Sequence, residues 1–146
     1  MIRTFEEILL RDLNALKNEI SQFKKTDDLW FIKGDIKNPA GVLSQHLCGN
    51  LKHFIGSVLG KTGYIRNRDL EFSQKNLSGE ELIRNVEETM EAVKKTFSKL
   101  DDTILPEKYP LPFAGKEVTV FELLVILTSH FGYHLGQINY LRRIQE

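Results

Sequence analysis

His130 and His134 lie four residues apart in HFGYH, inside a segment whose apolar residues have the spacing of a long helix. Side chains at positions i and i+4 lie on the same face of a helix, so this pair of imidazoles could hold one divalent ion. A third histidine, His46, belongs to an earlier helical segment and could complete one face of the coordination sphere. Three imidazoles would leave positions open for water or a substrate. The pattern therefore predicts a metal site that is able to do chemistry.

Four segments of the chain have the apolar periodicity of long amphipathic helices, and they must position these histidines. They cover residues 2–24, 38–59, 78–100 and 119–146. The third and fourth segments each begin with the spacing of a capping box, Ser78 with Glu81 and Thr119 with Glu122. The three histidines fall in the second and fourth of these predicted helices.

Two long connections separate the predicted helices. Residues 60–77 are polar and charged with little periodicity, and three prolines, Pro106, Pro110 and Pro112, exclude a continuous helix before the last segment. No segment has a convincing strand pattern. We predict an all-α fold, an antiparallel four-helix bundle in a single domain over 1–146, with long connections between helices two and three and between helices three and four. Bundles of this kind build metal sites from side chains on facing helices.

Composition sets limits on the class of protein. The 146 residues suit one domain, and 20 basic residues balance 20 acidic ones, so binding of nucleic acid through its phosphates has little support. The apolar run at 123–127 is too short to span a bilayer, and the acidic pair near the N-terminus is unlike a signal peptide. We therefore expect a cytoplasmic protein with no membrane contact. The single Cys48 cannot form an internal disulfide.

The neighbours of the histidines predict which way they point. His130 and His134 continue an apolar line with Leu127 and Ile138, which places both imidazoles toward the inside of the bundle. Spacing alone leaves a second interpretation open, in which buried histidines are core residues that hydrogen-bond to the backbone or to each other. Cys48 lies about 200° round the helix from His46 and is predicted to be a small core residue.

Further polar residues are candidates for the same site. Asn50, one helical turn after His46, could support a metal ligand or be a structural polar residue. His53 lies ~10 Å from His46 along the helix axis, too far to share an ion easily, so it could carry protons for the pocket or lie at the bundle end. Gln137 and Tyr133 are additional candidates for the pocket lining.

Two arginines in the 60–77 connection are candidates for substrate binding. Arg66 and Arg68 could meet an anionic substrate at the mouth of the site. Charged loops, however, usually pair with their own neighbours, which here are Asp69 and Glu71. Both interpretations remain open from the sequence.

Three stretches of the chain resemble the DinB-like superfamily, and the resemblance covers nearly the whole sequence. They are SQHLCGN at 44–50, YIRNRDLEF at 64–72 and SHFGYHLGQINYLRR at 129–143. The resemblance implies a four-helix bundle in which one histidine of an HLxGN segment and two of an HxxxH segment hold a divalent ion. In this chain those residues are His46, His130 and His134.

The same resemblance implies properties that the residues do not show by themselves. Members of the superfamily commonly form dimers, and its characterised enzymes use thiol cofactors such as bacillithiol, mycothiol or glutathione. We therefore expect a homodimer, a small-molecule substrate and a low-molecular-weight thiol. Three imidazoles accept nickel or zinc, with iron, manganese or copper as alternatives.

Two familiar metal mechanisms do not fit the motif. Phe131 stands where an HExxH zinc protease carries its glutamate base, and no glutamate precedes a histidine by three residues as in di-iron carboxylate bundles. The remaining mode is a metal that lowers the pKa of a bound water or thiol. We therefore expect a thiol S-transferase or a hydrolase, with a pocket bounded by helices two and four and overhung by 60–77. The alternative is a non-catalytic stress-response module whose ion only joins two helices.

Overall fold

The computed structural model describes residues 1–146 and contains only helices, turns and two isolated β-bridges. The α-helices are α1 (Ile2–Gln22), α2 (Ala40–Leu51), α3 (Arg68–Ser73), α4 (Gly79–Phe97) and α5 (Val120–Arg143). Two short 3-10 helices, η1 (Thr26–Trp30) and η3 (Asp102–Ile104), lie in the connections, and α2 continues into a π-helix, η2 (Lys52–Leu59). The prediction of an all-α fold is confirmed.

Local hydrogen bonds explain where the last two long helices begin. The Ser78 hydroxyl accepts from the backbone N–H of Glu81, and the Glu81 carboxylate accepts from the backbone N–H of Ser78. Thr119 and Glu122 form the same reciprocal pair at the start of α5. Each pair satisfies two backbone donors that the helix itself leaves unpaired. Both predicted capping boxes are confirmed.

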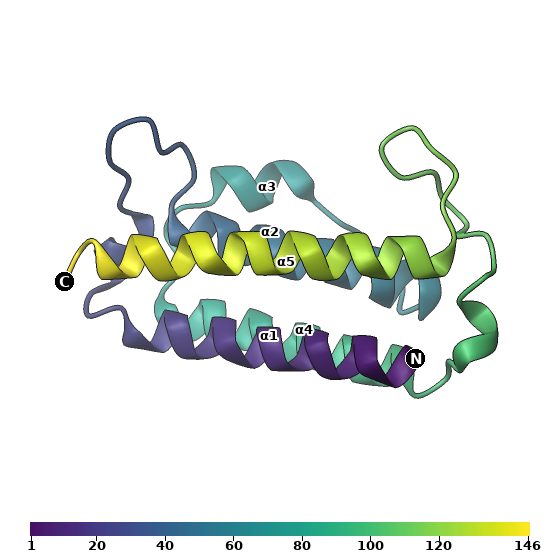
Figure 1. Ribbon diagram of the computed structural model, residues 1–146. Helices are drawn as coiled ribbons and strands as arrows, with labels where there is room; N and C mark the ends of the chain where they lie inside the picture. Colours follow the sequence, from purple (N-terminus) through teal and green to yellow (C-terminus); the bar gives the residue numbers. More distant parts are fainter.

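The long helices α1, α2, α4 and α5 pack side by side, and each contacts two of the others. Figure 1 shows α1 and α5 running in the same direction, from the right of the view to the left. Phe5 contacts Phe121 near one end of this pair, with ring centroids 5.8 Å apart, and Glu19 accepts from Arg142 near the other end. These contacts show that α1 and α5 are parallel.

The helix pair α2 and α4 is also parallel. In η2, the continuation of α2, Lys52 forms an ion pair with Glu88, and Gly60, directly after η2, lies against Thr96 further along α4. The pairs α1–α4 and α2–α5 are antiparallel, so the predicted antiparallel packing holds for two of the four contacts. An apolar stripe determines which face of a helix is buried but not the direction of the helix beside it. The chain between η2 and α4 returns along the molecule and makes the parallel pair possible.

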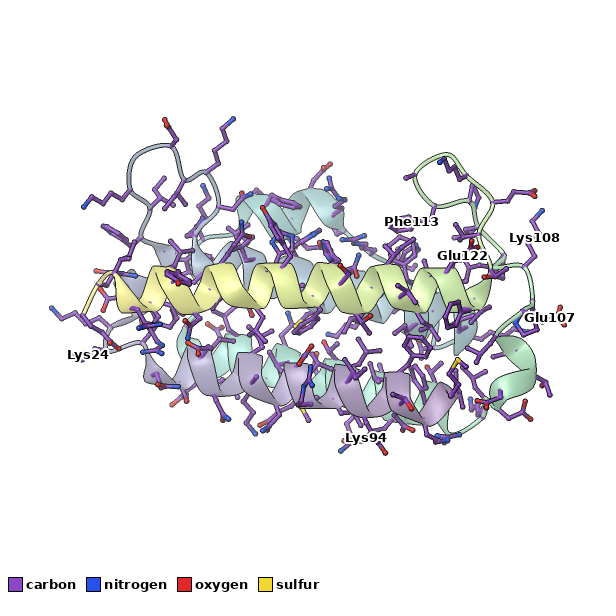
Figure 2. All side chains as sticks on the ribbon, in the orientation of Figure 1. Lys24, Lys94, Glu107, Lys108, Phe113 and Glu122 are labelled. Atoms are coloured by element: carbon purple, nitrogen blue, oxygen red, sulfur yellow. The ribbon has the colours of Figure 1, made fainter.

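One hydrophobic core joins the four long helices. Figure 2 shows side chains filling the space between the ribbons, while Lys94 and Lys108 project away from it. Fully buried members include Leu9, Leu13 and Leu16 of α1, Leu47 and Leu51 of α2, Leu82, Val86 and Val93 of α4, and Leu123, Leu127 and Phe131 of α5. None of the helices combines the length and the apolar character that a membrane span requires.

The 60–77 connection contains a helix that the sequence pattern did not predict. Residues Arg68–Ser73 form α3, and the side chain of Asn67 caps it by accepting from the backbone N–H of Leu70 at 3.1 Å. Its six residues are too few to display an apolar period, so the cap was the only local signal. The second predicted helix also differs, because its last part is the π-helix η2.

The parallel contact of α1 with α5 gives a prediction for stability. Glu19 accepts from Asn139 at 2.7 Å and from Arg142 at 2.6 Å, and its ion pair with Arg142 is largely buried. We expect Glu19→Ala to lower the free energy of unfolding by about 1–3 kcal/mol, because two partly buried donors lose their acceptor. Urea denaturation of the metal-free protein measures the change.

The control for this substitution is Glu87→Ala, which removes an ion pair with Lys17 that is exposed on the surface. We expect that change to cost less than about 1 kcal/mol. Equal effects of the two substitutions would contradict the described contact between α1 and α5.

Candidate metal centre

The three predicted histidines lie together between α2 and α5. One ring nitrogen from each of His46, His130 and His134 lies within 4.8 Å of the other two. The ring centroids are 5.0 Å apart for His46 and His130, 5.4 Å for His46 and His134, and 4.6 Å for His130 and His134. His46 lies 84 residues before His130 and 88 residues before His134, yet the ring nitrogens of the three meet in one small volume. Three imidazoles in this arrangement could hold a metal ion.

Burial favours the neutral form of His130 and His134. His46 is 7% exposed, and the other two are half-buried. Burial, together with the neighbouring His134 and His46, lowers the pKa of His130 to about 4. Burial also lowers the pKa of His134 below its ordinary value, against the opposing effect of its hydrogen bond to Gln137. A metal ion needs unprotonated nitrogen, so the surroundings favour the form that binds.

Hydrogen bonds on the far side of two rings determine which nitrogen faces the centre. His46 Nδ1 lies 3.4 Å from Glu71 Oε1, and His134 Nδ1 lies 2.7 Å from Gln137 Oε1. Both of these partners are oxygen acceptors. Nη2 of Arg66 also lies 3.4 Å from His46 Nδ1, but it already donates to Glu71 Oε1 at 2.9 Å, so the ring proton belongs on Nδ1 in each case. The lone pair of Nε2 is then left free to bind a metal. This is the usual way in which a protein fixes the orientation of a metal-binding histidine.

His130 differs from the other two. Its Nδ1 is buried and has no hydrogen-bond partner, and its Nε2 lies 3.1 Å from His46 Nε2. With the His46 proton on Nδ1, this contact pairs the Nε2–H of His130 as donor with the lone pair of His46 as acceptor. The alternative prediction, that the histidines hydrogen-bond to each other, therefore describes His46 and His130. It does not explain why the nitrogen of His134 lies beside them. No such bond joins His134 to either ring, although its nitrogen lies within the same small volume.

Glu71 is a residue of the site that the sequence did not reveal as such. It lies on α3, is 6% exposed, and receives two hydrogen bonds of 2.9 Å from Nε and Nη2 of Arg66. Burial alone raises the pKa of Glu71, but the hydrogen bonds from His46 and Arg66 outweigh it and hold the pKa below its ordinary value. The carboxylate is therefore ionised, and it accepts from His46.

Gly49 explains how a helix carrying this glutamate can lie against α2. A Cβ atom at position 49 would lie 2.0 Å from Glu71 Oε2, far inside any allowed contact. Gly49 is one helical turn after His46, on the same face of α2. The missing side chain thus makes room for the carboxylate that orients the imidazole. The glycine in HLCGN was visible in the sequence, but the residue that fills the space beside it, Glu71, lies 22 residues later in the chain.

The two arginines have partners within the protein. Arg66 is paired with Glu71, as the alternative of local pairing predicted, and the guanidinium of Arg68 lies over the ring of Phe72 at 4.9 Å. Of the further candidates on α5, Gln137 contacts His134 directly, and Tyr133 is 65% exposed with its ring 5.2 Å from His134.

The remaining candidates lie outside the group of three histidines. His53 is on η2, where its ring packs edge-on against Phe54. Asn50 is buried, and its side-chain oxygen has no partner. Cys48 is fully buried, and burial raises the pKa of its thiol to about 11, so it is a neutral core residue as predicted.

The cavity beside the histidines borders α2 and α5, as the sequence predicted, but the 60–77 connection does not line it. A cavity of about 620 Å³ borders His134 and Gln137 and is lined by residues 35–38 and the last turns of α5. The 60–77 connection was expected to overhang the opening. It instead packs onto α2 through Glu71 and contributes to a separate cavity of about 480 Å³, which no histidine lines. The buried ion pair of Arg66 and Glu71 thus holds the 60–77 connection against α2, away from the cavity beside His134.

Comparison with known proteins identifies the family. A family model described as a protein of unknown function (DUF1572) matches residues 4–146, and the chain belongs to this family. The family is part of the DinB-like superfamily, in agreement with the resemblance seen in the sequence. No curated protein matches the chain.

The contacts of His46 predict its tautomer. In the metal-free protein we expect His46 and His134 to carry their ring proton on Nδ1, which long-range proton–nitrogen NMR of histidine-labelled protein measures directly. Gly49→Ala should displace Glu71 and abolish the preference at His46 while leaving His134 unchanged.

Gly56→Ala is the matched control, since a Cβ there would meet Thr62 at 3.4 Å, an ordinary contact. It should leave the tautomers of both histidines as in the wild type. A wild-type His46 with its proton on Nε2 would show that Glu71 does not orient the ring.

Proposed function

We propose that this chain binds one divalent metal ion through His46, His130 and His134 and is a metal-dependent enzyme of DinB-like type. The observation that carries the proposal is the convergence of three ring nitrogens within 4.8 Å. Its support is the pair of hydrogen bonds to Glu71 and Gln137, which leave Nε2 lone pairs directed at one point. The lowered pKa of the half-buried His130, which favours its neutral form, fits the same donor set.

The packing of the four long helices supports a four-helix bundle as the description of the fold. We infer that α1, α2, α4 and α5 make a four-helix bundle of DinB-like type, with α3 as an addition between η2 and α4. Nickel or zinc suits three neutral imidazoles best, and iron, manganese or copper is also compatible with them. The resemblance to the superfamily further supports a homodimer.

The residues of this chain would position the ion and leave its reactive side open. When bound, a divalent ion supplies a lowered pKa to a coordinated water or thiol. Glu71, held by Arg66, fixes the ring of His46, and Gln137 fixes that of His134. Buried Phe131 occupies the position of the glutamate base in zinc proteases and packs into the core. Three protein donors leave at least one position for a substrate or cofactor.

The reaction class follows from this open position. A low-molecular-weight thiol bound as thiolate could attack an electrophilic small molecule, which would make the protein an S-transferase. Activated water in the same position would make it a hydrolase. A second candidate is a stress-response module with a structural ion, which is favoured by the location of the three histidines across the antiparallel pair α2–α5. Metal binding there would join two helices and stabilise the fold.

The metal content of the purified protein tests the proposed site. We expect elemental analysis of purified protein to give about one divalent ion per chain, since three facial donors make one mononuclear site. His130→Ala and His134→Ala should each lose the ion, because two imidazoles alone hold it weakly. His53→Ala is the control and should retain it, since His53 lies outside the group of three. Full occupancy in folded His130→Ala and His134→Ala proteins would refute the assignment.

The response of the bound metal to a thiol distinguishes the enzyme from the structural module. In cobalt-substituted protein we expect a small thiol such as 2-mercaptoethanol to change the visible absorption spectrum, because the thiolate enters the open position and releases a proton. The same titration of His134→Ala should show no change. A cobalt site that responds to no thiol, together with a fourth protein ligand, would favour the structural ion.

A further inference from the structure

The cavity beside His134 has an apolar wall. It has a volume of about 620 Å³, and its lining includes six hydrophobic side chains, Ile36, Leu43, Tyr133, Tyr140, Leu141 and Ile144. They come from the loop before α2, from α2 itself and from the C-terminal half of α5 and the residue after it. This volume is in the range of small-molecule sites, which are about 300–1,000 Å³.

Charge is nearly absent from this cavity. Asp35 and Lys37 are its only charged residues, and both are exposed and of opposite sign. The separate cavity between α2, α3 and α4 is different, since Glu71, Glu81, Arg84 and Glu88 line it. The surface next to the histidines thus offers no concentrated charge to recognise an anionic body.

One polar contact connects the apolar cavity to the histidines. Gln137 lines the cavity and also accepts from His134 Nδ1 at 2.7 Å. His134 itself forms part of the wall. A molecule in the cavity would therefore touch the same residue whose Nε2 faces the three-histidine centre. His46 and His130 do not line the cavity, so His134 is the residue at which the cavity and the centre adjoin.

We propose that this cavity is the substrate subsite of the centre and binds an uncharged alkyl or aryl group whose other end carries a metal-binding donor. The inference rests on the proposed function, and it names the class of substrate. Apolar side chains reward burial of apolar surface and give nothing to a charged group, so they select the substrate body by its hydrophobicity. Each methylene buried there should strengthen binding about fourfold.

Alkyl hydroxamates of two lengths test this inference directly. The hydroxamate group binds divalent metals, so acetohydroxamate reports on the open position alone and octanohydroxamate reports on the cavity as well. Titration of each into the cobalt-loaded protein, followed by visible absorption, gives the two dissociation constants. We expect octanohydroxamate to bind at least about tenfold more tightly, which needs only two buried methylenes.

Substitutions in exposed positions locate the effect. Ile36 is 39% and Ile144 54% exposed, so Ile36→Glu and Ile144→Glu leave the buried core intact. Each should remove most of the gain for octanohydroxamate and leave the affinity for acetohydroxamate within about twofold, since a carboxylate would be desolvated by the alkyl chain. Ile32→Glu is the matched control. Ile32 is 46% exposed and does not line the cavity, so its variant should keep the full gain.

The outcomes separate the subsite from the proposed function. Equal affinities for the two hydroxamates, or a gain that persists in both cavity variants, would overturn the subsite while the metal centre stands. Failure to bind cobalt through the histidines, with His134→Ala equal to the wild type, would overturn the proposed function and the subsite with it. Sedimentation measures whether the cavity wall is instead a contact between two copies of the chain. If Ile144→Glu dissociates a dimer and leaves the gain in affinity for octanohydroxamate unchanged, the wall binds a second copy and the subsite is overturned.

Discussion

A buried carboxylate needs partners, and this requirement organises one half of the molecule. Glu71 lies almost without exposure between α2 and α3, where an unpaired charge would be very costly. Arg66 supplies the opposite charge, His46 supplies a ring N–H, and Gly49 supplies the space. The three residues come from two separate segments. Their meeting fixes how the chain between η2 and α4 lies on α2, and it fixes the orientation of one imidazole of the candidate centre.

The three imidazoles are therefore held in unequal ways. His46 is oriented by a charged network, His134 by the neutral amide of Gln137, and His130 by its own contact with His46. The contact of His46 with the charged Glu71 is 3.4 Å long, against 2.7 Å for the contact of His134 with Gln137. The α2 side of the centre carries the charged network, and the α5 side borders the cavity. Such a division suits a centre in which one side holds the ion and the other admits a molecule.

Much of this arrangement could be predicted from short-range patterns. The capping boxes of α4 and α5, the apolar stripes and the i, i+4 spacing of His130 and His134 depend on neighbours along one helix. The supporting residue Glu71 could not be found in this way. Its signal is a glycine on one element and a glutamate on another, and the two meet only in three dimensions. The direction of α2 beside α4, and the location of the cavity near Ile36, depend on the path of connections that have no period.

The centre also joins parts of the chain that are distant in sequence. His46 and His130 are 84 residues apart, and α5 is synthesised after α1 to α4. Contacts between distant residues carry a loop-closure cost that must be met before they contribute, so they tend to form late in folding. A chain that has completed α1 to α4 has a single histidine of the three. The complete set of donors therefore exists only in a chain whose synthesis has passed α5 and in which α5 has docked.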